Sequence, residues 1–157
     1  MNICAVDPGL SGAMAILQDG EVTAKPLPIG GKDLDLATLA DWLKSASPGL
    51  LVIEKVHSMP GQGVSSTFKF GQGYGAILGI AAALSIPTEL VTPQAWKKTV
   101  LAGTAKDKDA AIDYCRRMFP QVSLLPGPRC RKPHDGLADS LCILEYGRRV
   151  LVGQLSG

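Results

Sequence analysis

Residues 2–27 read NICAVD, PGLSG, AMAILQ, DG and EVTAKPL in order, so three short apolar runs alternate with turn residues. The runs at 2–7, 13–18 and 21–27 have the length and composition of strands, whereas the Pro and Gly residues between the first two favour a turn. Asp19-Gly20 is a strong hairpin signal. The chain is therefore expected to open with three consecutive strands that meander back and forth.

The rest of the sequence alternates between helical and strand-like patterns. Apolar residues recur with helical spacing over 34–43, with Asp33 or Asp35 as the cap, and residues 50–54 form a short apolar run typical of a buried strand. The other expected elements are an irregular Gly- and Pro-rich stretch at 58–66, a helix at 67–84, a strand at 88–91, a helix that begins at Thr92-Pro93, a helix at 106–119 with Thr104 and Asp107 as a capping box, a basic loop at 126–133 and a helix at 134–152.

This order predicts an α/β fold built on a mixed five-stranded sheet. Three antiparallel strands plus two parallel ones are expected, with helices on the faces of the sheet. The length of 157 residues and the lack of internal repeats predict a single domain spanning 1–157.

The composition is that of a folded protein of the cytoplasm. Hydrophobic residues make up 46% and charged residues 19% of the chain, which excludes a disordered protein. No secretory signal is visible, and the longest apolar run, 76–84, is well short of the roughly 20 residues of a membrane span. The four cysteines include no CxxC pair, and Cys115, Cys130 and His134 fit no standard zinc spacing. We expect reduced thiols, a cytoplasmic location and no membrane association.

Positive charge is concentrated in one part of the chain. Between Val91 and His134 there are nine Lys or Arg residues and three Asp residues, a surplus of six positive charges. Because the whole chain carries a formal charge of +2, the rest has a surplus of four negative charges. Such a segment is typical of a polyanion partner, although a solvated surface that keeps the protein soluble is an alternative.

Four acidic residues lie at the ends of expected elements. Asp7 ends the first strand and Glu54 the fourth, and Asp135 and Asp139 lie four residues apart on one face of the last helix. A carboxylate at the tip of a buried strand costs several kcal/mol unless a cation accompanies it. Both strand ends are neighbours in the expected sheet, and the last helix can pack across them. We expect an oxygen-rich site for two Mg²⁺ or Mn²⁺ ions about 4 Å apart, suited to phosphodiester hydrolysis.

Each acid also has an ordinary structural explanation. Asp7 can serve the Asp-Pro-Gly turn, Glu54 can pair with Lys55 or Lys97, and acids in a first helical turn are common caps. His134 can be a metal ligand, a proton donor to the leaving group, or a surface histidine at a helix start. The coincidence of all four acids at one expected edge favours the metal site.

Five motifs follow one another along the chain: Asp7-Pro-Gly-Leu-Ser-Gly, Ile53-Glu54, Phe70-Gly-Gln-Gly-Tyr-Gly, Thr92-Pro-Gln-Ala-Trp-Lys-Lys-Thr-Val and His134-Asp-Gly-Leu-Ala-Asp-Ser-Leu. As an ordered set, from residue 2 to about 145, they resemble RuvC-type Holliday-junction resolvases of bacteria and phages, which have a ribonuclease H-like fold. The resemblance implies a homodimer that cuts four-way DNA junctions symmetrically, with Mg²⁺ or Mn²⁺ held by four carboxylates.

The resemblance also implies roles for individual residues. Asp7, Glu54 and Asp139 fall on the first, second and last acids of the family. The bacterial pattern has its third acid three residues before the last, where this chain has Gly136, so Asp135 or His134 takes that role. These residues are expected to be catalytic, with the four acids as metal ligands.

The expected DNA contacts come from basic and aromatic residues. Lys97 and Lys108 match the family's basic residues near the scissile phosphate. His57 stands where the family has an aromatic residue three positions after its second acid, and Phe68 or Phe70 is the alternative for base stacking. Further phosphate contacts are expected from Lys98, Arg129 and Arg131.

Two features are left open by the sequence. The stretch 57–66 is either the element that touches the junction core or an ordinary surface loop. The glycines at 71, 75 and 79 in the following helix allow close approach of another backbone, either the protein's own sheet or a second copy across a two-fold axis. The resemblance favours the second copy.

Three alternatives to a junction-cutting nuclease remain. One is an RNA-processing nuclease of the same fold, and another is a non-catalytic junction-binding dimer with a degenerate site. The third is an actin-like phosphotransferase, which needs two such halves where this chain has room for one. Gly30-Gly31-Lys32 lacks the other residues of a P-loop, so no nucleotide cofactor is expected.

Overall fold

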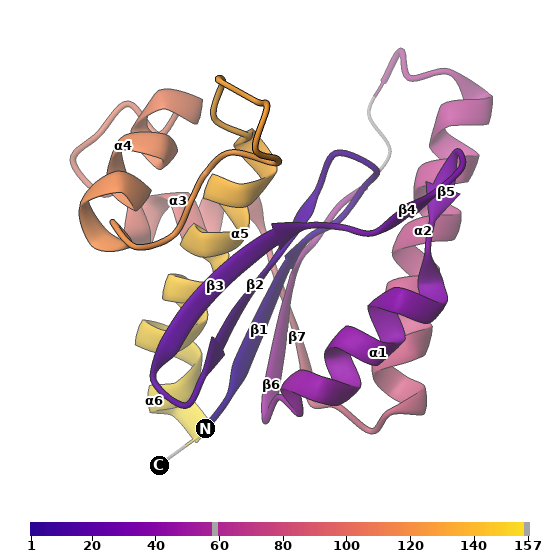
Figure 1. The fold of residues 1–157 in the computed structure, drawn as a ribbon, viewed down its shortest axis with the longest axis horizontal. Helices are drawn as coiled ribbons and strands as arrows, with labels where there is room; N and C mark the ends of the chain where they lie inside the picture. The colour runs from indigo at the N-terminus through magenta and orange to yellow at the C-terminus, as the bar shows by residue number, and fades with distance from the viewer. Residues whose placement is uncertain (58–59, 156–157) are drawn as a thin grey trace.

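The computed structural model describes residues 1–57 and 60–155, and its centre is a five-stranded sheet of order β3-β2-β1-β6-β7 (Figure 1). The first three strands pair antiparallel, whereas β6 pairs in parallel with both β1 and β7. The predicted mixed sheet is therefore confirmed. Its strands are β1 (Ile3–Asp7), β2 (Ala13–Gln18), β3 (Glu21–Pro26), β6 (Leu50–Glu54) and β7 (Thr88–Val91).

Helices cover both faces of this sheet (Figure 1). One face carries α1 (Leu36–Ala46) and α2 (Val64–Ala83), and the other carries α3 (Pro93–Val100), α4 (Lys108–Met118) and α5 (Asp135–Tyr146). The described part of the chain ends in a π-helical segment, η1 (Gly147–Leu151), and a short helix, α6 (Val152–Leu155). None of the helices within the described ranges combines the length and hydrophobicity needed to cross a membrane.

The strands bury side chains on both faces because each face has its own layer of helices. In β1, Ile3 and Ala5 join the core beneath α3, α4 and α5, whereas Cys4 and Val6 join the core beneath α1 and α2. This alternation follows from the two-residue period of a strand. Small residues (Ala5, Ala13 and Ala15) line the face that α5 covers, which lets this helix come close to the sheet.

Several sequence-based boundaries are wrong for local reasons. The stretch predicted as irregular ends early, because α2 begins at Val64, directly after the last residue of the Gly- and Pro-rich run, Gly63. Residues 58–59 of that stretch lie outside the described ranges. The capping box at 104–107 does not form: Lys106 has a positive φ of 57°, so α4 starts at Lys108, with Asp107 as its cap.

Two further differences concern elements that the sequence did not reveal. A two-stranded ribbon, β4 (Ile29–Gly30) and β5 (Asp33–Leu34), precedes α1, for which Asp35 is the cap. The last helix was expected to run unbroken to residue 152, but its α-helical part ends at Tyr146 and the π-helical η1 follows. A Cβ at Gly147 would lie only 2.8 Å from Val52, so glycine lets the chain pass close to the sheet at this point.

Candidate active site

The ends of β1 and β6 bring Asp7 and Glu54 to one edge of the sheet, the upper edge in Figure 1. The two strands are parallel neighbours, with Val6 opposite Ile53, so the next residues, Asp7 and Glu54, lie side by side at the strand ends. Both acidic side chains are partly buried. The predicted neighbourhood of the two strand ends is confirmed.

Gly136 lets the start of α5 dock against the turn that follows Asp7, and Gly12 lets that turn close on itself. A Cβ at Gly136 would lie 2.6 Å from the carbonyl oxygen of Ser11, and one at Gly12 would lie 1.9 Å from the carbonyl oxygen of Asp7. A side chain at Gly136 would therefore force α5 and the turn apart. Gly136 is flanked by Asp135, so this docking carries the first acid of α5 to the Asp7 turn. It also explains why this chain has no acid three residues before Asp139.

Asp7 interacts electrostatically with the three other acids. Burial is the main cause that raises its pKa from 3.8 to about 8, and the charges of Glu54, Asp139 and Asp135 raise it further, in that order. The positive charge of Lys97 acts in the opposite direction. The acids of α5 therefore lie near enough to Asp7 to affect its charge.

The other acids respond to the same surroundings. Burial, followed by the charge of Glu54, raises the pKa of Asp139 to about 6, although Lys97 opposes the shift. Burial raises the pKa of Glu54 as well, and a hydrogen bond from Trp96 and the charge of Lys97 lower it. Lys97 therefore acts on three carboxylates of the group. Such a concentration of partly buried carboxylates at one edge is typical of functional sites.

The carboxylates fit a hard divalent cation by their chemistry. Oxygen ligands suit Mg²⁺ and Mn²⁺, and a cation would offset both the burial and the repulsion that raise the pKa values of Asp7 and Asp139. Within residues 1–57 and 60–155, however, no three His, Cys, Asp or Glu side chains stand as a group that could hold a metal ion. The Nζ of Lys108 donates to Oδ2 of Asp135 at 2.6 Å. The acids thus interact electrostatically, but among the described residues they do not form a compact metal-binding group.

Trp96 is a part of the site that the sequence did not predict. Its side chain is fully buried, and its indole Nε1 donates a hydrogen bond of 2.7 Å to Oε2 of Glu54. A buried tryptophan generally finds an acceptor for its N–H. Its position four residues after the Thr92 cap places it on the first turn of α3, but nothing in the sequence identifies Glu54 as the acceptor.

His134 caps α5. Its Nδ1 accepts a hydrogen bond of 3.2 Å from the backbone N–H of Leu137, and its side chain is partly buried. The cap fixes Nδ1 as an acceptor, so the proton of a neutral imidazole resides on Nε2. If His134 acts as a metal ligand or a proton donor, it does so through Nε2.

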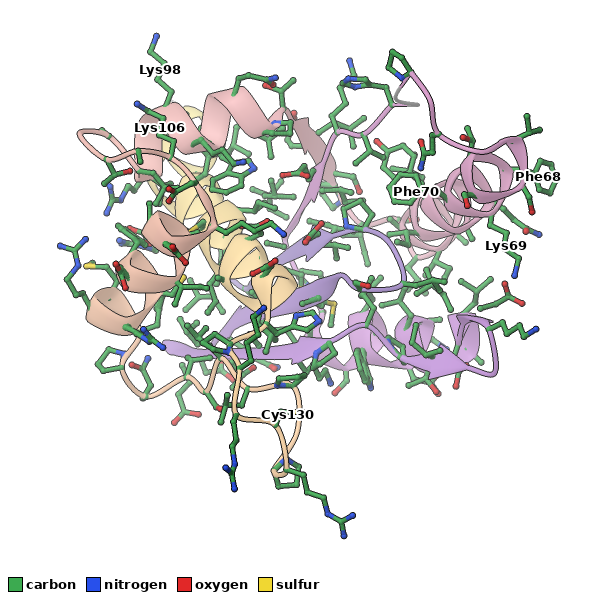
Figure 2. All side chains as sticks on the ribbon, turned by 90° about the horizontal axis from the view of Figure 1, so that it is seen from above. Phe68, Lys69, Phe70, Lys98, Lys106 and Cys130 are labelled. Atoms are coloured by element: carbon green, nitrogen blue, oxygen red, sulfur yellow. The ribbon has the colours of Figure 1, made fainter. Side chains whose placement is uncertain are left out.

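The predicted basic residues do not lie in one area of the surface. Lys98 and Lys106 lie together at one border of the molecule seen from above, whereas Cys130 lies at another border (Figure 2). Arg129 and Arg131 flank Cys130 in the sequence and are exposed, as is Lys98. The arginines therefore belong to a second basic area, next to the first strands.

The predicted aromatic residues differ in exposure. Phe68 is 71% exposed at the start of α2 and lies on the side of the molecule opposite Lys98 (Figure 2). Phe70 is partly buried, and its ring lies 3.1 Å from the point where Gly9 would carry a Cβ, so it packs on the turn after β1. His57 is exposed and follows β6 by three residues. Phe68 and His57 are the side chains left accessible to a large ligand.

No protein-family model matches the chain, and a comparison with curated proteins finds no match. Solved structures do match. RuvC from Thermus thermophilus has a TM-score of 0.61 at 20% identity, over 94% of this chain and 96% of that one. The yeast mitochondrial Holliday junction resolvase Ydc2 has a TM-score of 0.56 at 13% identity, over 90% and 75%. The fowlpox virus resolvase, solved with Holliday junction DNA, has a TM-score of 0.51 at 18% identity, over 92% and 99%. At these identities the likeness establishes the fold, which is that of RuvC.

Proposed function

We propose that this protein is a metal-dependent endonuclease that resolves four-way DNA junctions. One observation carries the proposal: carboxylates from three distant parts of the chain interact at the edge of a sheet with the RuvC fold. Structural acids in a first helical turn or a strand-end turn have no reason to converge on one point. Junction resolvases among the structural neighbours support four-way DNA as the substrate.

Asp7, Glu54, Asp135 and Asp139 are the proposed ligands of two Mg²⁺ or Mn²⁺ ions. Such ions lower the pKa of a bound water and stabilise the leaving oxygen in phosphodiester hydrolysis. Lys97 offsets part of the repulsion among the acids before any ion binds, since its charge lowers the pKa values of Asp7, Glu54 and Asp139. His134 is a further candidate through Nε2, either as a ligand or as a proton donor.

The basic residues are proposed to hold the DNA backbone on either side of the acids. Lys108 is exposed and its long side chain can move from Asp135 to a phosphate. The exposed Lys98 is proposed to contact the backbone as well, and Arg129 and Arg131 a second stretch of it. Phosphate contacts of this kind give affinity and salt dependence without base specificity. Phe68 and His57 are proposed to contact bases at the junction centre.

A homodimer is proposed because a four-way junction offers two equivalent strands to cut. The outer face of α2 is the candidate interface, since Gly71, Gly75 and Gly79 have open space where a Cβ would be, and the residues around them are largely exposed. A second helix can approach closely there. The reducing cytoplasm is the proposed location, which fits the free thiols of Cys4, Cys115, Cys130 and Cys142.

Cleavage of a labelled junction tests the proposal directly. The protein is incubated with a four-way junction, a matched linear duplex and a structured RNA in one buffer, with Mg²⁺ or with EDTA. Paired, symmetric nicks in the junction alone, dependent on Mg²⁺, are expected. Preferential cleavage of the RNA would replace the proposal by an RNA-processing nuclease. Tight junction binding without cleavage, in Mg²⁺ and in Mn²⁺, would replace it by a non-catalytic binding protein.

A further inference from the structure

The hydrogen bond between Trp96 and Glu54 joins a fully buried side chain to an acid of the candidate site. Trp96 is 0% exposed, and its Nε1 lies 2.7 Å from Oε2 of Glu54. The bond engages one carboxylate oxygen and leaves Oε1 outside any hydrogen bond that the described residues make with Glu54. A fully buried donor therefore holds one carboxylate oxygen of Glu54 and leaves the other without a described hydrogen bond.

The backbone around Glu54 fixes the place of this donor. Glu54 pairs with Val91 at the ends of β6 and β7, and the N–H of Lys55 donates to the carbonyl of Val91 at 2.7 Å. The chain then turns at once into α3, because Thr92 caps the helix by accepting from the N–H of Ala95. One helical turn later, Trp96 projects back toward the strand ends. α3 also packs against α5, and Trp96 belongs to the same hydrophobic core as the buried residues of α5.

We infer that Trp96 is a positioning residue, whose indole N–H holds the Glu54 carboxylate so that Oε1 is presented to the divalent ion. This inference rests on the proposed metal-dependent function. Residues that orient a metal ligand through a hydrogen bond typically contribute about 10–100-fold to metal affinity or activity. Trp96 acts on Glu54 alone among the acids, in contrast to Lys97, whose charge acts on three of them.

A purely structural role for Trp96 makes a different prediction. If Glu54 merely satisfies the buried N–H, loss of that N–H lowers the free energy of unfolding but leaves the metal affinity of the folded protein unchanged. If the indole positions Glu54, its loss weakens metal binding, and an excess of Mg²⁺ restores cleavage. Trp96→Phe removes the N–H and keeps an aromatic ring, so it separates the two roles.

Nuclear magnetic resonance of the wild-type protein tests the contact without a change at Trp96. The chain has two tryptophans, so two indole N–H signals are expected, and Trp42, which lies under Lys25 on the α1 side, is the internal control. Glu54→Ala is expected to shift the Trp96 signal and leave that of Trp42 in place. Mg²⁺ is expected to shift the Trp96 signal in the wild type but not in Asp7→Asn. A Trp96 signal whose position is changed neither by Glu54→Ala nor by Mg²⁺ would overturn the inference.

Trp96→Phe supplies the quantitative test, with Trp42→Phe as the matched control. Calorimetric titration of the folded variants with Mn²⁺ is expected to show metal binding at least about tenfold weaker for Trp96→Phe and unchanged for Trp42→Phe. Unchanged binding in folded Trp96→Phe would overturn the inference even if the wild type cuts junctions. If the wild type cuts no nucleic acid but its Trp96 signal and metal affinity respond as expected, the positioning role stands and the proposed nuclease activity fails.

Discussion

Helices α5 and α2 lie on opposite faces of the same sheet and differ in how far the fold covers them. Nine of the twelve residues of α5 are buried, whereas only two of the twenty residues of α2 are. α5 presses against the strands through small residues and through Gly136, and it carries two of the four acids. α2 leaves most of its surface open. α5 is thus fixed against the sheet together with its acids, whereas α2 is the proposed surface for a partner.

The largest effect is expected for a change at Asp7, the acid that interacts with the acids of both β6 and α5. Asp7→Asn keeps the shape of the side chain but removes a charge that interacts with the other three acids. We expect junction cleavage to fall by more than about 10³-fold, since outer-shell partners alone contribute about 10–100-fold. Junction affinity, measured in Ca²⁺ or EDTA by gel shift, should remain close to that of the wild type. Cleavage at the wild-type rate would remove Asp7 from the mechanism.

The same group of acids makes the stability of the metal-free protein depend on pH. A carboxyl group whose pKa is raised in the folded protein contributes its full stabilisation only when the pH is below its ordinary pKa of 3.8. This contribution is lost as the pH rises to the pKa in the folded protein, which is about 6 for Asp139 and about 8 for Asp7. In EDTA, we expect the melting temperature to fall by several degrees between pH 5 and pH 8, and Mg²⁺ to restore it.

Asp7→Asn should flatten this decline and raise the melting temperature at pH 8. Asp41→Asn, a change at an exposed acid of α1, is the control and should leave the decline as it is in the wild type. A metal-free wild type that gains stability from pH 5 to pH 8 would contradict the account of the buried acids.

A methyl group added under α5 tests how tightly this helix is docked. Gly136→Ala would place its Cβ 2.6 Å from the carbonyl oxygen of Ser11, so the helix start must move away from the Asp7 turn. Overpacking of this kind typically costs about 1–3 kcal/mol. Thermal melts should show the loss of stability, and Mn²⁺ titration should show weaker metal binding. A variant as stable as the wild type, with intact metal binding, would show that the docking tolerates movement.

Lys108 connects α4 to the acid group of α5 and tests the proposed phosphate contact. Lys108→Ala removes the partner of Asp135 and one exposed positive charge. Junction affinity should fall, and the slope of log K against log salt should decrease by about one unit. Fluorescence anisotropy over a range of salt concentrations measures this slope. A weaker complex with an unchanged slope would mean that Lys108 acts through Asp135 and not through a phosphate.

The smallest effect is expected for a glycine-to-alanine change on the exposed helix α2, the counterpart of Gly136→Ala on α5. A Cβ at Gly75 would meet nothing within 4 Å, so Gly75→Ala should stabilise α2 by about 0.5–1 kcal/mol through helix propensity. If this face of α2 is the dimer interface, the same methyl group should weaken self-association in sedimentation experiments. Dimers as strong as those of the wild type would place the interface elsewhere on the protein.

Much of the fold could be predicted because local patterns and sheet rules point the same way. The apolar runs at 2–7 and 50–54 each end in an acid, and parallel neighbours bring such ends together, so the neighbourhood of Asp7 and Glu54 followed from strand order. The Thr92-Pro93 start of α3 was correct for the same reason, since cap chemistry is local.

What could not be predicted depends on contacts between distant segments. The hydrogen bond from Trp96 to Glu54 joins residues 42 positions apart, and no pattern in either segment marks the pair. The tight approach of Gly136 to Ser11 is likewise visible only once α5 is placed on the sheet. The π-helical turn after Tyr146 has no sequence signature that we can identify.

The central claim is that carboxylates from β1, β6 and α5 bind divalent ions together. A crystal structure of the protein grown with Mn²⁺, with anomalous difference density measured near the manganese edge, tests it most directly. We expect two peaks about 3.5–4 Å apart among Asp7, Glu54, Asp135 and Asp139. Ordered carboxylates with no anomalous peak between them, at a Mn²⁺ concentration in the millimolar range, would contradict the claim.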